Sequence, residues 1–183
     1  MSDRRAAKLD MPHGIIIFGP NGSGKSTVGP ELARILGVKY MDIEEYAFEP
    51  SDMPYTAARP REECLRLMLA DIEKHRGFVL SACTGDFGDT IPRYYKLAVY
   101  ISAPLALRLE RVERRAYDRH GDRVLKDGDM YGQRQEFFDW VARRPLEKID
   151  QWAETLTCPV IHADGTKDWR MNAADIAERY LAL

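Results

Sequence analysis

Residues 15–26 read Ile15-Ile16-Ile17-Phe18-Gly19-Pro20-Asn21-Gly22-Ser23-Gly24-Lys25-Ser26. An apolar run leads directly into a segment that fits the pattern G-x-x-x-x-G-K-[ST] at every required position. The glycines permit backbone conformations that a side chain would forbid, so successive N–H groups can turn inward around an anionic phosphate. The stretch therefore predicts a strand followed by a phosphate-binding loop.

The side chains of this loop suit a nucleoside triphosphate with its metal. Lys25 supplies a full positive charge, the Ser26 hydroxyl is placed to ligate Mg²⁺, and the next helix adds its partial positive charge at the same spot. That helix is indicated over 27–36 by apolar residues at helical spacing, and it stops at Gly37. We expect ATP and Mg²⁺ as cofactors. The predicted contacts to ATP from this loop are Gly19, Asn21, Gly22, Ser23, Gly24, Lys25, Ser26 and Thr27.

Length and composition favour one globular domain over residues 1–183. The apolar share of 45% is ordinary for a protein with a full core. Lys and Arg total 27 against 29 Asp and Glu, so no overall basic field would draw the protein to nucleic acid. Neither a nucleic-acid nor a membrane partner is expected.

The cysteines and the apolar runs bear on the compartment. Cys64, Cys83 and Cys158 are widely spaced and form no C-x-x-C pair, which is typical of reduced thiols in a cytoplasmic protein. No apolar run is long enough to span a bilayer. Residues 1–12 carry basic side chains that are not followed by the apolar h-region of a signal peptide, so we expect a flexible leader there.

Short apolar runs alternate with helical patterns along the chain. Such continuous runs are typical of parallel strands that are buried on both faces. The predicted fold is therefore an α/β, three-layer α/β/α sandwich with a five-stranded parallel sheet and a mobile lid. The strands are expected at 15–18, 38–41, 78–80, 97–101 and 160–161, and the further helices at 61–75, 105–117 and 171–181. The polar, glycine-containing segment 118–131 is predicted as a mobile loop, within a lid over about 112–145.

Ligands of parallel sheets sit beyond the carboxyl ends of the strands, which makes residues after each run the site candidates. Asp42 and Glu44 lie on one side of an extended segment, with Ile43 opposite. Asp42 could hold the metal, and Glu44 could orient or deprotonate an acceptor hydroxyl. The alternative is an acidic helix start in solvent. After the third run, Thr84 and Gly85 could admit a second substrate, although a plain turn explains them equally well.

Six arginines lie within sixteen residues. Arg111 and Arg115 are four residues apart and share a helix face, so both could point toward transferring phosphates. The alternative is a surface helix whose arginines pair with the interspersed acids. The six are Arg108, Arg111, Arg114, Arg115, Arg119 and Arg123, and the acids are Glu110, Glu113, Asp118 and Asp122.

From Gly14 to its C-terminus the chain resembles the P-loop small-molecule and nucleotide kinases, the group that contains adenylate, shikimate and gluconate kinases. The segment 42–44 resembles the D-x-D of shikimate and gluconate kinases, in which the first acid serves the metal and the second the acceptor. Here the second acid is Glu44, which leaves the acceptor open. The segment 84–86 lacks the glycine triplet of shikimate kinases, and no nucleoside monophosphate site follows the first helix.

A proline at 104 followed by Arg111 and Arg115 is similar to the R-x-x-x-R pattern of adenylate kinases. The resemblance implies that Arg111 stacks on the base, that Arg115 touches the transferring group, and that Arg119 and Arg123 belong to a lid. The segment 162–166 resembles the turn that lines the adenine pocket of the same kinases. This implies contacts to ATP from Asp164 and Thr166, although a helix N-cap would look identical.

The sequence thus predicts an enzyme that transfers the γ-phosphoryl group of ATP to a small-molecule acceptor. The alternatives are a nucleotide-binding ATPase or switch, and a polynucleotide kinase whose arginines hold a strand. The expected catalytic residues are Lys25, Asp42 and Arg115, with Ser26 and Asp42 as metal ligands. The expected acceptor-binding residues are Glu44, Thr84, Gly85 and Arg119.

Overall fold

The computed structural model describes residues 11–183, and most of the predicted leader therefore lies outside the described residues. Five strands form one sheet in the order β2-β3-β1-β4-β5, with every neighbouring pair parallel. This confirms the predicted five-stranded parallel sheet. The strands are β1 (His13–Phe18), β2 (Lys39–Asp42), β3 (Gly77–Ala82), β4 (Tyr95–Ser102) and β5 (Val160–Asp164).

Helices follow the strands, as the alternating pattern predicts. The one at 61–75 has the predicted bounds, and those at 105–117 and 171–181 are longer by a few residues. None of the helices in residues 11–183 has the length and apolarity needed to cross a membrane. The helices are α2 (Lys25–Leu36), α3 (Ile43–Ala47), α4 (Arg61–His75), α5 (Leu105–His120), α6 (Tyr131–Arg143), α7 (Glu147–Ala153) and α8 (Trp169–Leu181), with short 3₁₀ turns η1 (Pro92–Tyr94) and η2 (Gly121–Val124).

The central strand β1 feeds two cores, one on each face of the sheet. Ile15 and Ile17 pack with residues of α2 and α8, whereas Ile16 and Phe18 pack with residues of α4 and α7. All four side chains are fully buried. Because successive strand residues point to opposite faces, a strand with cores on both sides must be apolar throughout. The result is the predicted three-layer sandwich.

The edge strand β5 is longer than its apolar run. It pairs with β4 from Val160 through Asp164, although Val160, His162 and Asp164 are exposed. Only one neighbour holds an edge strand, so polar residues are tolerated on its open side. A search for continuous apolar runs therefore finds only the first part of β5.

The expectation of a loop over 118–131 is wrong for its first part. Helix α5 continues through Asp118 to His120 and ends at Gly121, whose φ of 56° lies in the left-handed region. The N–H of Gly121 donates to the Tyr117 carbonyl. Polar residues can stay helical on an exposed face, so the glycine and not the change in polarity ends the helix.

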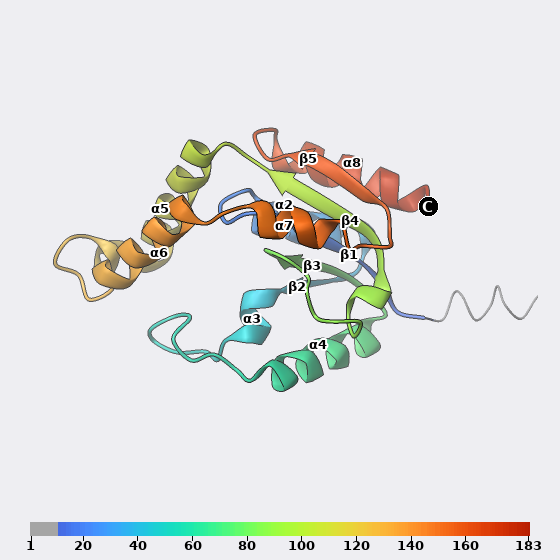
Figure 1. The fold of residues 1–183 in the computed structure, drawn as a ribbon, viewed down its shortest axis with the longest axis horizontal. Coiled ribbons are helices and arrows are strands. Elements are labelled where there is room, and N and C mark those ends of the chain that lie inside the picture. The colour runs from blue at the N-terminus through green and yellow to red at the C-terminus, as the bar shows by residue number, and fades with distance from the viewer. Residues whose placement is uncertain (1–10) are drawn as a thin grey trace, which may run out of the picture.

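Beyond α5 the chain is held by local bonds. The Met130 N–H donates to the Arg123 carbonyl at 2.9 Å, and the Arg123 guanidinium pairs with Asp129 at 2.7 Å. In Figure 1 the strands point toward the side from which α5 and α6 project. The predicted lid, about 112–145, thus corresponds to the second half of α5, η2 and α6 beyond the carboxyl ends of the strands.

Candidate active site

The predicted phosphate loop joins the end of β1 to the start of α2. Gly19 and Gly22 have φ values of 139° and 79°, which side chains rarely adopt. A Cβ atom would also lie 2.2 Å from the Ile101 carbonyl oxygen at Gly19 and 2.4 Å from the Arg108 carbonyl oxygen at Gly22. Both glycines are therefore required by the backbone conformation and by close contacts with β4 and α5.

Lys25 is the first residue of α2, and its ammonium group folds back over the loop. Its Nζ donates to the carbonyls of Gly19 at 2.9 Å and Pro20 at 2.8 Å. Burial lowers the pKa of Lys25 below its ordinary value, the nearby Cys83 partly opposes this, and the charge of Arg115 lowers the pKa further. An anion that arrived beside Lys25 would relieve this unfavourable environment.

Three arginines of α5 face the loop. Arg111 donates to the Gly165 carbonyl at 2.9 Å and to the Ser23 carbonyl at 3.4 Å. Arg115 lies 3.5 Å from the Ser26 hydroxyl oxygen. The buried Arg108 lies one turn earlier. Arg111 and Arg115 thus share a face directed at the loop, as their spacing predicts.

The alternative of a salt-bridged surface helix applies only to other members of the cluster. Arg114 lies 3.9 Å from Glu110, and Arg123 pairs with Asp129. Arg119 donates instead to the hydroxyl of Tyr55 at 2.9 Å. The six arginines therefore include some that form ion pairs in solvent and others that face the site.

Asp42 both caps a helix and faces the site. Its Oδ1 accepts from the Glu44 N–H at 3.1 Å, which caps α3, and its Oδ2 accepts from the Tyr40 hydroxyl at 3.3 Å. Burial raises the pKa of Asp42, the bond from the Glu44 N–H partly opposes this, and the Glu44 carboxylate raises the pKa again. Both interpretations of this acid, cap and site residue, are therefore consistent with its surroundings.

Two cavities adjoin the loop. The first, which we call the loop cavity, has a volume of about 490 Å³ and is lined by residues 21–28, Asp42, Arg111 and the turn after β5. The second, the lid cavity, has a volume of about 530 Å³ and lies between the segment after α3 and helices α5 and α6. Asn21, Glu44 and Arg115 line both. The two cavities therefore meet at a carboxylate, a guanidinium and an amide.

The turn between β5 and α8 forms part of the wall of the loop cavity. Asp164 Oδ1 accepts from both the N–H and the hydroxyl of Thr166, at 2.8 and 2.7 Å, and the hydroxyl bond is the main cause of its lowered pKa. Thr166 and Gly165 line the cavity, whereas Asp164 shapes the turn behind them. A Cβ atom at Gly165 would lie 2.3 Å from the Ser23 carbonyl oxygen.

The remaining predicted residues are distributed as follows. All the loop residues from Asn21 to Thr27 line the loop cavity, and Arg119 lines the lid cavity. Thr84 and Gly85 line neither of these cavities. A Cβ atom at Gly85 would lie 2.7 Å from the Tyr95 hydroxyl oxygen, so this glycine serves packing under the sheet.

Two residues at the site had no role predicted from the sequence. Cys83 lines the loop cavity and its thiol donates to Asn21 Oδ1 at 3.4 Å; it follows β3, where the strand-end rule points. Arg144 donates to the same Oδ1 at 3.1 Å and stacks 4.7 Å from the centre of the Trp140 ring. Arg144 follows α6, and no motif marks it.

The donor set suits Mg²⁺. Ser26 and Asp42 offer hard oxygen donors to one cavity. Across residues 11–183, no three or more His, Cys, Asp or Glu gather as a ready-made metal cage. Mg²⁺ typically takes one or two protein oxygens and completes its shell with phosphates and water, which is the pattern these residues would support.

Comparison with known proteins places the chain in a family. A family model described as an AAA domain matches residues 15–139. The uncharacterized protein YqaC of Bacillus subtilis (strain 168) is 30% identical over 159 residues, which cover 82% of this chain and 88% of that protein. A cytidylate kinase of Ignicoccus hospitalis is 28% identical over 149 residues, which cover 74% of this chain and 81% of the kinase.

A solved structure shares the fold. The shikimate kinase from Acinetobacter baumannii, in complex with shikimate, has a TM-score of 0.56 at 18% identity and covers 97% of both chains. At this identity the likeness concerns the fold alone. The chain belongs to the family whose model is described as an AAA domain. The loop motif, the parallel sheet and the relatives together identify it as a P-loop nucleotide or small-molecule kinase.

Proposed function

We propose that the protein transfers the γ-phosphoryl group of ATP, as its magnesium complex, to a hydroxyl of a small molecule held in the lid cavity. One observation carries this proposal: the loop cavity and the lid cavity share Asn21, Glu44 and Arg115. A triphosphate held by the loop would end where the second cavity begins. Transfer requires the two reacting groups to be held side by side in this way.

Different residues of the loop cavity bind the phosphates and the metal. The loop amides and Lys25 bind the β- and γ-phosphate oxygens, and Arg115 binds the transferring group, whose equatorial oxygens carry the charge. Ser26 and Asp42 would hold Mg²⁺, which supplies charge neutralisation across the phosphates when bound. Each of these residues lines the loop cavity.

Glu44 orients the acceptor. A hydroxyl in the lid cavity donates its hydrogen bond to the Glu44 carboxylate, which then accepts the proton. The bond between the acceptor oxygen and the γ-phosphorus forms, the bond between that phosphorus and the β–γ bridging oxygen breaks, and ADP leaves with the released electron pair. Glu44 lines both cavities, as this role requires.

The test compares Lys25→Ala with Lys74→Ala, a matched control at the exposed end of α4. Each purified protein is incubated with γ-labelled ATP, Mg²⁺ and a panel of alcohols and sugar acids, together with a single-stranded oligonucleotide. We expect Lys25→Ala to lose transfer by about 100-fold or more, because it removes a preorganised cation, while its melting temperature stays close to that of the parent.

Two results would count against the proposal. Full ATP-dependent transfer by Lys25→Ala would show that the loop lysine takes no part in the reaction. Transfer to the oligonucleotide alone, with an affinity that falls steeply as salt rises, would favour the polynucleotide alternative.

A further inference from the structure

The lid cavity is lined by aromatic rings from two separate segments. Phe48 and Tyr55 follow α3 and meet edge to face, with ring centres 5.4 Å apart. Phe137 and Trp140 lie on α6 and stack at 5.8 Å. Tyr55 is 44% exposed, Phe137 is 37% exposed and Trp140 is 48% exposed, so none of these three is a core residue. Exposed rings gathered around one cavity mark a binding surface.

Aliphatic side chains complete this wall. Val112 and Ala116 of α5 and Val124 and Met130 of the predicted lid line the same cavity. A ligand there would bury apolar surface on several sides. The volume of about 530 Å³ falls within the range of small-molecule sites and is large enough for a body of nucleoside size.

The charges around the lid cavity are balanced. Its charged side chains are three carboxylates and three guanidiniums, those of Glu44, Glu113, Glu136, Arg115, Arg119 and Arg134.

The guanidiniums of the lid cavity already have partners. Arg134 pairs with Glu113, and Arg119 donates to the Tyr55 hydroxyl at 2.9 Å. Arg115 faces the Ser26 hydroxyl, where a phosphate would take up its charge. With ATP bound, Arg119 would remain in the lid cavity together with the carboxylates of Glu44 and Glu136, which leaves no excess of positive charge for an acid.

We propose that the acceptor is an uncharged alcohol that carries a planar ring system of nucleoside size, and not a polyhydroxy acid. This inference rests on the proposed function and specifies its substrate class. The rings and aliphatic side chains bind the flat body, and the balanced charges disfavour a carboxylate. Among the carboxylates of residues 11–183, Glu44 alone lines both cavities, so the reacting hydroxyl projects from the ring body toward it.

The experiment uses the full chain with two sets of probes. Thymidine, cytidine and naphthyl ethanol are the ring-bearing alcohols, and shikimate and gluconate are the polyhydroxy acids. Binding is measured by calorimetry with a non-hydrolysable ATP analogue in place, so that the loop cavity is filled. Transfer from γ-labelled ATP is measured separately. We expect kcat/KM for at least one ring-bearing alcohol to exceed that for both acids by about tenfold or more.

Variants locate the site. Trp140→Leu and Phe137→Leu should each lower kcat/KM for the preferred alcohol by about tenfold, because stacking with an aromatic ring is lost. Tyr117→Leu is the matched control, since Tyr117 is an exposed aromatic residue of α5 that lines neither cavity. Two α6 variants are needed because Trp140 also supports Arg144.

The outcomes separate this inference from the function on which it rests. Transfer to shikimate or gluconate in preference to the ring-bearing alcohols would overturn the substrate class and leave the kinase assignment intact. Binding of the alcohols without transfer to any probe would support the ring site and contradict the kinase. If no ring-bearing alcohol is either bound or phosphorylated, the inference is overturned. It is also overturned if Tyr117→Leu loses as much kcat/KM as the two α6 variants.

Discussion

Asp42 combines two roles that use the same carboxylate. It caps α3 through the Glu44 N–H and it faces the loop cavity, while burial raises its pKa. Keeping this group ionised costs stability, because the folded protein holds the charge less readily than the unfolded chain does. A cap alone would not need the charge, since asparagine caps helices equally well.

Replacing Asp42 with asparagine separates these roles. The ordinary aspartate pKa is 3.8 and the folded value is higher, so without Mg²⁺ the parent loses stability as pH rises from below 3.8 through the folded pKa. Asp42→Asn keeps the cap and does not lose stability in this way. We expect its melting temperature to exceed that of the parent, and the difference to grow as pH rises from 3.8 to the folded pKa of Asp42 and to stay constant above it.

The same variant should lose magnesium-dependent ATP binding by about tenfold or more, because a charged oxygen donor is removed. Thermal melts across pH and calorimetry with and without Mg²⁺ measure the two effects. A variant that is less stable than the parent at every pH would contradict this account of Asp42, and Asp175→Asn on the exposed face of α8 serves as the control.

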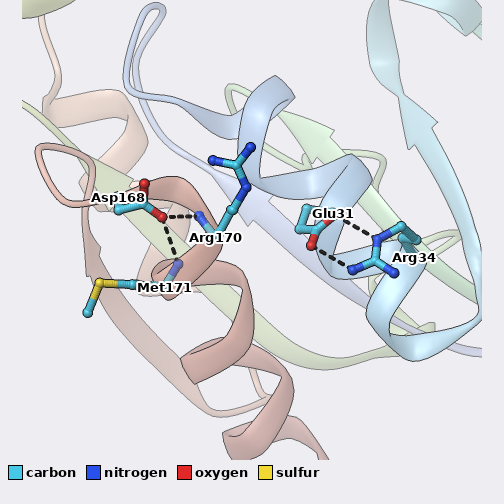
Figure 2. Close-up of polar contacts among 5 residues, drawn as sticks. All are labelled: Glu31, Arg34, Asp168, Arg170 and Met171. Atoms are coloured by element: carbon cyan, nitrogen blue, oxygen red, sulfur yellow. Dashed lines mark hydrogen bonds and ion pairs between the residues drawn. The ribbon is translucent and has the colours of Figure 1, made fainter.

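The helices α8 and α2 begin in contrasting ways. Figure 2 shows the Asp168 carboxylate at the start of α8, where it accepts from the N–H groups of Arg170 at 2.9 Å and Met171 at 3.2 Å. The N-cap of α2 is Gly24, which offers no side-chain bond. The first N–H groups of α2 therefore have no side-chain cap and would be available to a phosphate, whereas those of α8 are capped within the chain.

Removing the α8 cap should therefore cost stability. We expect Asp168→Ala to lower the free energy of unfolding by about 1 kcal/mol, measured by urea denaturation. Asp175→Ala on the same helix is the matched control, because its exposed pair with Arg179 at 2.9 Å is screened by solvent. The Glu31–Arg34 pair of α2, also drawn in Figure 2, belongs to this weak class, since Arg34 lies in solvent. Equal losses for the two alanine variants would argue against the cap.

Across the whole molecule, the sheet and the segment α5–α6 meet at the phosphate loop. Arg108 and Arg144 both donate to Asn21, one from α5 and one from beyond α6. Gln133 of α6 donates to the Pro54 carbonyl at 2.9 Å, which ties α6 to the segment after α3. A ligand that binds the loop would therefore affect the segments on both sides of the lid cavity.

We expect the magnesium complex of a non-hydrolysable ATP analogue to slow amide hydrogen exchange over 121–143 and to leave β1 unchanged, because the lid would close on the filled loop. At about 100 times its dissociation constant, the analogue should stabilise the fold by about 2.7 kcal/mol. Lys25→Ala should show neither effect. Protection limited to 19–27 would show that α5 and α6 do not respond as a lid.

The sequence by itself determined the parts of the protein that are encoded locally. The phosphate loop is one contiguous segment whose glycines, lysine and serine need no distant partner to be read. The five strands follow from apolar runs because a parallel sheet buries both faces. The helix at 61–75 is also encoded locally, because its apolar residues repeat at helical spacing along one face.

Only the tertiary structure decided how the site is assembled. The meeting of Asn21, Glu44 and Arg115 between two cavities joins three separate elements, and the bond from Arg144 to Asn21 spans 123 positions. The position of Gly85 against Tyr95 likewise depends on packing beneath the sheet. Such contacts are fixed by how helices pack on strand ends, and no local pattern of residue types carries that information.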